Sequence, residues 1–333
     1  MTLPRFTHIM PSSLNEALDL LHEKGETGRI KAGGSDFVVA MKHKTALPEF
    51  VLNMAGLKEL DFIRPEPGGG LVIGVLTTLS AIVGSEQVRK QYPILSQAAG
   101  KVATVQIRNV ATIGGNVCLD TRCWYYNQSA QWRKAVALCY KLGGDRCHVI
   151  KNSDKCNAVF LADTVPALMA LDAQLKVVRK GAEKIISMEK FYNESGHPPN
   201  LLRPDELVSE IHIPRGPEKA FTFFYKDAPR DVIDFALVNL AMRIDFQNHD
   251  GVCKSARIAV GGVTSFPVFS EKGVQVLKGE KITGALIDKA TELVLKEIAP
   301  ISPIWVSPGQ RRQTVGVFVK RGLTAALAQN LNK

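Results

Sequence analysis

The chain has 333 residues, of which 45% are hydrophobic and 22% charged, a balance that supports a folded core without disulfide bonds. No apolar run approaches the roughly 18 residues of a bilayer span, and the first residues lack the apolar region of a secretory signal, so we expect a cytoplasmic protein with no membrane span. The net charge of +10 is not gathered into a basic run with interleaved aromatic residues, which argues against a nucleic-acid partner.

Short helices and strands are predicted along the first half of the chain. Ser13 and Glu16 form a capping box, an apolar face follows and Gly25 is a natural stop, which predicts a helix over residues 13–24. Further helices are predicted at 37–42, 78–83 and 93–99, and 165–171 is a helix or a buried apolar run. Strands are predicted at 30–32, 50–53, 71–73 and 174–178.

The last third of the chain is predicted to form a separate domain. Prolines punctuate the stretch before it, and the main domain boundary is expected near Pro214 to Lys219. Beyond it, strands are predicted at 221–225, 240–246 and 255–260, and helices at 288–298 and 313–329.

Two glycine-rich loops are candidate binding features. Ala32–Asp36 separates a predicted strand from a predicted helix, where backbone amides can face a phosphate, and Thr112–Asn116 has a similar composition. Either loop alone can be a simple turn. Together they can hold one pyrophosphate from two sides, with side-chain hydrogen bonds from Ser35, Thr112 and Asn116. Neither loop matches the Rossmann or phosphate-loop motif, which argues against the usual modes of NAD or ATP binding.

Four of the six cysteines lie in one segment of 34 residues after the second glycine loop: Cys123, Cys139, Cys147 and Cys156. The surrounding residues, about 119–158, include seven Lys or Arg against three Asp or Glu and are predicted to be an insertion outside the core. In a reducing compartment such a cluster favours a metal centre over disulfide bonds.

The spacing of these cysteines favours an iron–sulfur cube. Loops of 7 to 15 residues allow four thiolates to surround one cluster. Zinc prefers pairs of cysteines separated by two to four residues, which this segment lacks, so zinc is one alternative and unligated thiols another. Cys118 and Cys253 are predicted to be buried free thiols, although Cys118 can replace Cys123 as a ligand. His148 is expected beside the site rather than as a ligand.

Several segments carry a resemblance to a known family: Lys31–Asp36, Ile73–Leu79, Ala111–Asn116, Ala162–Ala173, Tyr225–Asp234 and Ala256–Val263. They resemble the FAD-binding medium (β) subunit of the molybdenum hydroxylases, the family of xanthine dehydrogenase and carbon monoxide dehydrogenase. The resemblance covers nearly the whole chain except the insertion.

This resemblance implies an α+β fold. A two-subdomain FAD-binding domain of the vanillyl-alcohol-oxidase (PCMH) type is implied for residues 1–216, with subdomains of about 1–55 and 56–216. A smaller α/β C-terminal flavoprotein domain is implied for residues 217–333.

The resemblance also implies the residues that bind FAD. Both glycine loops are implied to hold the pyrophosphate, and Asp163 and Lys226 to lie near the flavin ring or its ribityl chain. A capping role for Asp163 and a solvated Lys226 are the alternatives. The implied cofactor-binding set is Ile30, Lys31, Ala32, Gly33, Gly34, Ser35, Asp36, Phe37, Thr77, Thr112, Ile113, Gly114, Gly115, Asn116, Asp120, Asp163 and Lys226.

The insertion resembles that of the β subunit of 4-hydroxybenzoyl-CoA reductase, a branch in which four insertion cysteines hold an extra [4Fe–4S] cluster. Cys123, Cys139, Cys147 and Cys156 are therefore the implied metal ligands. Neighbouring aromatic and basic side chains are expected to shield the cluster and offset its charge: Trp124, Tyr125, Tyr126, Trp132, Arg122, Arg146 and Lys155.

The implied function is electron transfer, with no catalytic residue on this chain. The expected partners are a molybdopterin-binding large subunit and a small subunit with two [2Fe–2S] clusters, in a dimer of heterotrimers. A ferredoxin is implied to supply electrons through [4Fe–4S], FAD and [2Fe–2S] to molybdenum, where 4-hydroxybenzoyl-CoA is dehydroxylated in aromatic degradation. One alternative is outward electron flow in an aldehyde, N-heterocycle or aromatic hydroxylase. Others are a zinc-stabilised assembly subunit without redox activity and a lone flavin oxidase.

Overall fold

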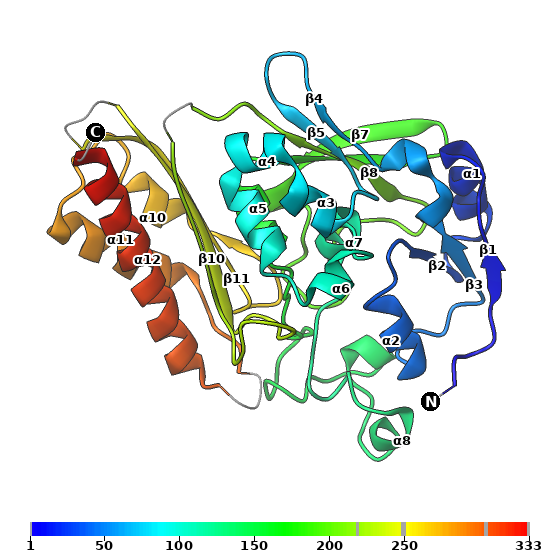
Figure 1. Cartoon of the computed structure of the whole chain (residues 1–333). Coiled ribbons are helices and arrows are strands. Elements are labelled where there is room, and N and C mark those ends of the chain that lie inside the picture. Colours follow the sequence, from blue (N-terminus) through cyan, green and yellow to red (C-terminus); the bar gives the residue numbers. More distant parts are fainter. Residues whose placement is uncertain (1, 218–219, 248–250, 303–305, 332–333) are drawn as a thin grey trace.

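The computed structural model describes residues 2–217, 220–247, 251–302 and 306–331, so part of the predicted domain boundary, at 218–219, lies outside the described residues. Within them the strands form three sheets, and helices pack between and around these sheets (Figure 1). The strands are β1 (Thr7–Ile9), β2 (Gly28–Lys31), β3 (Phe50–Asn53), β4 (Ile63–Pro65), β5 (Leu71–Gly74), β6 (Gln174–Arg179), β7 (Ala182–Ser187), β8 (Leu207–Ile213), β9 (Phe221–Asp227), β10 (Val238–Phe246), β11 (Cys253–Gly261) and β12 (Val268–Phe269).

Most of the helices are short. They are α1 (Leu14–Lys24), α2 (Phe37–Lys42), α3 (Leu79–Gly84), α4 (Glu86–Gln91), α5 (Pro93–Gly100), α6 (Val105–Arg108), α7 (Ile113–Val117), α8 (Ala130–Arg133), α9 (Thr164–Ala170), α10 (Glu271–Gln275), α11 (Gly284–Glu297) and α12 (Pro308–Leu331). Single-turn 3-10 helices lie at Met54–Gly56, Lys58–Leu60, Tyr140–Leu142 and Met188–Lys190. None of the described helices is long and apolar enough to cross a membrane.

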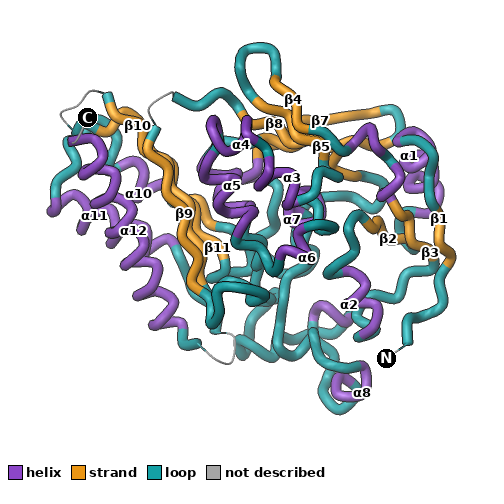
Figure 2. The backbone as a smooth tube through the Cα atoms, viewed as in Figure 1, coloured by secondary structure: helices purple, strands orange, loops and turns teal. Residues whose placement is uncertain are grey.

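The first two sheets differ in strand direction. The N-terminal sheet has the order β1-β3-β2, and its strands are parallel. The second sheet has the order β4-β5-β8-β6-β7 and is antiparallel. Helices α3, α5 and α7 lie between the N-terminal sheet and the third sheet (Figure 2).

The third sheet, β12-β11-β10-β9, is antiparallel and separates two apolar cores. Helices α10 and α12 pack on one face, and α5 and α9 pack on the other (Figure 1). Side chains alternate along β10, so Leu240 and Met242 enter the core under α12 while the small Ala241 faces the larger core. The sheet therefore joins the last third of the chain firmly to the rest.

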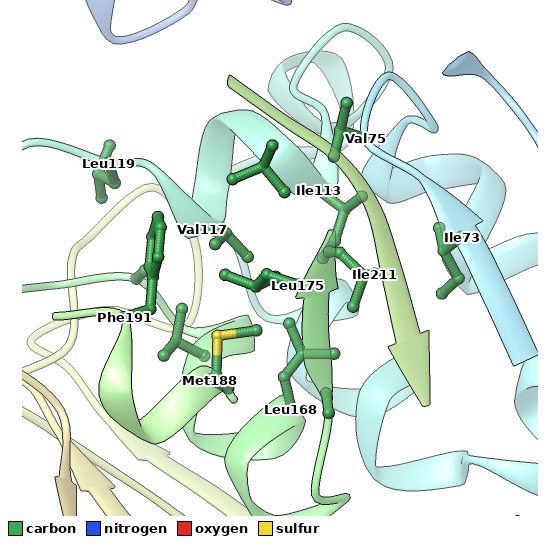
Figure 3. Packing of buried hydrophobic residues seen from close by; sticks show 14 of the residues in the cluster. Ile73, Val75, Ile113, Val117, Leu119, Leu168, Leu175, Met188, Phe191 and Ile211 are labelled. Carbon is green, nitrogen blue, oxygen red and sulfur yellow. The ribbon is translucent and has the colours of Figure 1, made fainter. Parts of the chain in front are cut away.

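The larger core fixes the segment that carries the second glycine loop. Ile113 and Val117 of α7 are fully buried and lie beside Leu168 of α9 and Leu175 of β6 (Figure 3). A well-packed core tolerates little displacement. The start of α7, and with it the loop at Thr112, is therefore held in place by packing.

The structure confirms most of the predicted elements and extends several. The capping box places α1 correctly: Ser13 accepts the Glu16 amide, while the Glu16 carboxylate accepts from Ser12 instead of Ser13. Helix α11 begins four residues earlier than predicted because the Thr283 hydroxyl accepts the Leu286 amide and caps the first turn. Strands β1, β4, β7, β8 and β12 were not predicted. The insertion contains no strand, only α8 and the 3-10 helix Tyr140–Leu142.

Candidate cofactor-binding site

A cavity of about 1060 Å³ lies where the N-terminal sheet, α7, the insertion and the segment before β10 meet. This large cavity is at the upper end of the size range of ligand pockets and suits an extended dinucleotide. Most of the predicted cofactor-binding residues line it: Ile30, Lys31, Ala32, Gly33, Gly34, Ser35, Asp36, Phe37, Thr112, Gly114, Gly115, Asn116, Asp120 and Asp163.

Three predicted residues lie outside this lining. Ile113 is part of the apolar core. The Thr77 hydroxyl is buried and bonds the backbone of Phe62, accepting its amide and donating to its carbonyl. Lys226 does not line the cavity but contacts Asp163, which does.

The first glycine loop approaches the second too closely for any side chain. A Cβ atom on Gly33 would lie 1.9 Å from the carbonyl oxygen of Val110, just before the second loop. Gly34 has φ of +78°, which favours glycine. Among the described residues, the amides of 33–36 donate to no protein acceptor. Adjacent free amides at a helix start can bind a phosphate.

The amides and side chains of the second loop are already engaged within the protein. The amides of Ile113 and Gly114 donate to the carbonyls of Thr77 and Val75, each at 2.9 Å. The Thr112 hydroxyl accepts the Gly115 amide at 3.1 Å, capping α7. Asn116 Oδ1 accepts from the Thr164 hydroxyl at 2.6 Å. The second loop therefore forms a rigid part of the cavity wall rather than a source of free hydrogen-bond donors.

An arginine of the insertion joins three parts of the cavity wall. Arg122 donates to the Asp36 carboxylate of the first loop, and its guanidinium carbon lies 4.7 Å from the centroid of the Phe235 ring. Burial raises the pKa of Asp36, and the Arg122 charge opposes that rise. Residues from the N-terminal part, the insertion and the last third of the chain thus meet at one point.

Asp163 and Lys226 form a buried ion pair beside the cavity. Lys226 Nζ lies 2.6 Å from Asp163 Oδ2, and both side chains are 4% exposed. Asn239 Nδ2 donates to the other carboxylate oxygen at 2.8 Å, and Lys226 also donates to the carbonyl of Lys101. Burial raises the pKa of Asp163, opposed by the Lys226 charge and both hydrogen bonds. The pair ties α9 to β9 at the cavity edge.

Part of the wall was not among the predicted cofactor-binding residues, although the resemblance to the family extends to Asp234. The segment Ile233–Phe235 lines the cavity, and the Ile233 amide donates to the carbonyl of Ala103 at 3.0 Å. Ile233 has φ of 69°, a left-handed conformation that a β-branched residue rarely adopts and that sequence does not foretell. The signal available in the sequence was the group of apolar residues Val232, Ile233 and Phe235, whose side chains are exposed in the structure.

A second, small cavity brings the four predicted metal ligands together. Cys123, Cys139, Cys147 and Cys156 all line this cysteine cavity, although they are spread over a segment of 34 residues. Cys118 instead lines the large cavity, where burial raises its pKa to about 12. All six cysteines are free thiols. His148 also lines the cysteine cavity, with Nε2 2.8 Å from the carbonyl oxygen of Ala137.

Hydrogen-bond donors surround the sulfur atoms of this cavity. Burial raises the pKa of Cys123, opposed by amides of Tyr125 and Tyr126. Burial also favours a higher pKa at Cys147. However, Asn157 Nδ2, 3.5 Å from the sulfur, and neighbouring amides outweigh burial and lower this pKa below its usual value. Donors aimed at sulfur stabilise thiolates, and hydrogen bonds to sulfur set the properties of iron–sulfur clusters. The donor set therefore fits such a cluster.

A single metal ion and a four-iron cube require different arrangements of the thiols. No group of three or more His, Cys, Asp or Glu side chains in the described part of the chain is placed to hold one ion. Four thiolates on one zinc ion lie about 3.8 Å apart, given a bond of about 2.3 Å. A four-iron cube carries one thiolate per iron and spreads them more widely. The four thiols share one cavity, as a cube with one thiolate per iron requires.

Two family models match the chain. The model for the FAD binding domain in molybdopterin dehydrogenase matches residues 4–216. The model for the CO dehydrogenase flavoprotein C-terminal domain matches residues 223–326.

Curated proteins and solved structures agree with these models. The chain is 34% identical over 245 residues to the aldehyde oxidoreductase FAD-binding subunit PaoB of Escherichia coli, covering 71% of this chain and 74% of that protein. It is 27% identical over 328 residues to the carbon monoxide dehydrogenase medium chain of Afipia carboxidovorans, covering 98% of each. It matches a cyanide-inactivated Cu,Mo-CO dehydrogenase structure with a TM-score of 0.80 and 26% identity, covering 98% of this chain and 100% of that chain.

These matches confirm the predicted fold class, an FAD-binding domain followed by a C-terminal flavoprotein domain. The chain belongs to the xanthine dehydrogenase and CO dehydrogenase family of molybdenum hydroxylases, as an FAD-binding medium subunit of an oxidoreductase.

Proposed function

We propose that this chain transfers electrons between two redox groups of its own, FAD in the large cavity and a [4Fe–4S] cluster in the cysteine cavity. Bound FAD exchanges electrons singly or in pairs, so it supplies a junction between one-electron carriers and two-electron chemistry. The observation that carries the proposal is the contact between the two cavities: Tyr126 and Lys141 belong to both linings.

The residues of the large cavity take separate roles in this proposal. The free amides of 33–36 hold the pyrophosphate, and the second loop forms the opposite wall. Asp163 orients the ribityl chain or the ring edge of FAD, and Lys226 holds the Asp163 carboxylate in position. Thr77 and Ile113 support the wall from the core. The FAD-binding domain comprises residues 1–216 and the C-terminal domain 217–333.

The partners follow from what the chain lacks. Once four cysteines are assigned to one cluster, only Cys118 and Cys253 remain, too few for a further cluster. We therefore assign the molybdopterin to a large subunit and two [2Fe–2S] clusters to a small subunit, in a cytoplasmic dimer of heterotrimers. The substrate site lies on the large subunit.

The insertion suits an acidic one-electron carrier such as a ferredoxin. Its seven Lys or Arg against three Asp or Glu give a net charge of +4, and Trp124 and Trp132 are partly exposed on it. Opposite charge speeds the encounter of redox partners. Inward flow from this carrier supports reductive dehydroxylation of 4-hydroxybenzoyl-CoA, in which two electrons and two protons release the hydroxyl as water.

Outward flow in an aldehyde oxidoreductase is the second candidate. The observation that favours it is the 34% identity to the FAD-binding subunit PaoB. The same two cavities serve both directions. The assembled complex distinguishes the two directions. Bleaching of the flavin absorbance by an aldehyde alone indicates outward flow. Bleaching by reduced ferredoxin that 4-hydroxybenzoyl-CoA then reverses indicates inward flow.

The test removes one thiolate and follows electron delivery. In Cys139→Ser we expect iron to be lost, FAD to be retained and the reduction of the flavin by reduced ferredoxin to slow at least tenfold. Cys253→Ala is the matched control, because its thiol is buried in the third sheet, and it should keep both iron and rate. Flavin reduction at the wild-type rate in an iron-free Cys139→Ser chain would contradict the proposal.

A further inference from the structure

Two side chains form a partition between the two cavities. Among the described residues, Tyr126 and Lys141 line both the large cavity and the cysteine cavity. The Lys141 ammonium lies 4.6 Å from the centroid of the Tyr126 ring. Lys141 belongs to the 3-10 helix that follows Cys139, so the partition is built into the insertion.

Lys141 is a buried cation whose donors are all used. Its side chain is only 2% exposed. The ammonium donates to Asp120 Oδ1 at 2.7 Å, to the Thr121 hydroxyl at 2.8 Å and to the Thr121 carbonyl at 3.0 Å. An ammonium has three hydrogens, so this geometry fixes the position of the charge. A buried cation of this kind is a poor source of net stability, because its desolvation offsets its attraction to its partner.

The partner of Lys141 is much more exposed than Lys141 itself. The Asp120 side chain is 49% exposed, so water screens its carboxylate, whereas the ammonium is enclosed. The Lys141 charge also acts in both cavities. Lys141 lines the cysteine cavity together with Cys156. Burial lowers the pKa of His197, which lines the large cavity, and Lys141 lowers it further.

We propose that Lys141 is the shared electrostatic partner of the two redox groups, stabilising an added electron in either cavity and so raising both midpoint potentials. The inference rests on the proposed function, because it requires a reducible group in each cavity. No bond forms or breaks at Lys141. The residue acts as a positioning residue through a fixed charge at the partition, and charges beside a cluster or flavin set its potential.

Two neutral replacements separate the charge from the hydrogen bonds. Lys141→Gln keeps a donor to Asp120 and Thr121, while Lys141→Met keeps none. Midpoint potentials are measured on the full chain, isolated without oxygen, by redox titration that follows the flavin by absorbance and the cluster by electron paramagnetic resonance. Both potentials should shift to more negative values in both variants, with unchanged FAD and iron content.

The control removes an exposed lysine charge beside the same cluster. Lys155 precedes Cys156, and its side chain is 44% exposed. Water screens this charge, so Lys155→Met should leave the flavin potential unchanged and move the cluster potential much less than either Lys141 variant does.

The outcomes distinguish this inference from the function on which it rests. A wild-type chain that contains FAD but no iron would contradict the proposed function, and with it the shared role of Lys141. A wild-type chain with both groups, in which the Lys141 variants move only one potential or neither, overturns the shared role alone. Loss of the cluster in both variants would identify Lys141 as an anchor of the site and also reject the shared role.

Discussion

The large cavity and the cysteine cavity are adjacent but are built in different ways. The loops that line much of the large cavity are held by elements that pack on an apolar core, such as α7, whose first residue Ile113 is part of that core. The cysteine cavity lies within an insertion that has no strand and only one α-helix, α8, of four residues. The core therefore shapes the first cavity before any cofactor binds, whereas the second must be held by other forces.

Buried polar side chains hold the insertion against the rest of the protein. Arg133 is 8% exposed and donates to the carbonyls of His43 and Lys44 at 3.0 and 2.9 Å, and also to that of Gln128. The Tyr126 hydroxyl donates to the carbonyl of Thr45 at 2.9 Å. These contacts anchor the insertion to the segment that follows α2. In the insertion, hydrogen bonds replace apolar packing, so each of these bonds contributes more to the local structure than a single apolar contact does in the core.

The largest expected effect is on the packed region. Asp163→Asn leaves the Lys226 ammonium buried without its counterion, which should lower the free energy of unfolding by about 3–5 kcal/mol. Chemical denaturation of the variant measures this loss. Pairing it with Lys226→Met removes the stranded charge, so the double variant should recover part of the stability. A single variant as stable as the wild type would show that the ion pair does not hold α9 to β9.

A smaller effect is expected from loosening the insertion. Arg133→Met leaves several carbonyls without their charged donor and should lower local stability by roughly 1.5–3 kcal/mol. Hydrogen exchange should quicken within 119–158 and stay unchanged in the third sheet. Lys134→Met, at the exposed neighbouring position, is the control. Faster exchange spread through the whole chain would mean that the insertion is not a separate unit.

The smallest effect on stability is expected at the first glycine loop. In Gly33→Ala the new Cβ meets the carbonyl of Val110, and the backbone must shift at a cost of about 1–3 kcal/mol. Because that shift moves the free amides, the FAD content per chain should fall, as absorbance measures. Gly84→Ala places its Cβ in open space and should bind FAD normally. Equal FAD content in both variants would show that the first loop does not contribute to FAD binding.

The sequence predicted the structure of the packed region better than that of the insertion, for physical reasons. Helix α1 and both glycine loops depend on local capping and backbone freedom, which neighbouring residues reveal. Strand β7 is an edge strand with mostly exposed side chains, so it lacks the alternation that marks a strand. Arg133 and Lys141 resemble any basic residues of a basic segment. Their burial depends on contacts to distant residues that no local pattern records.

Cofactor content tests the central claim most directly. The chain is isolated without oxygen and analysed for FAD, iron, acid-labile sulfide and zinc. The account predicts one FAD with about four iron and four sulfide per chain, since the cysteine cavity gathers four thiols. One FAD with a single zinc ion, or with no metal, would contradict it.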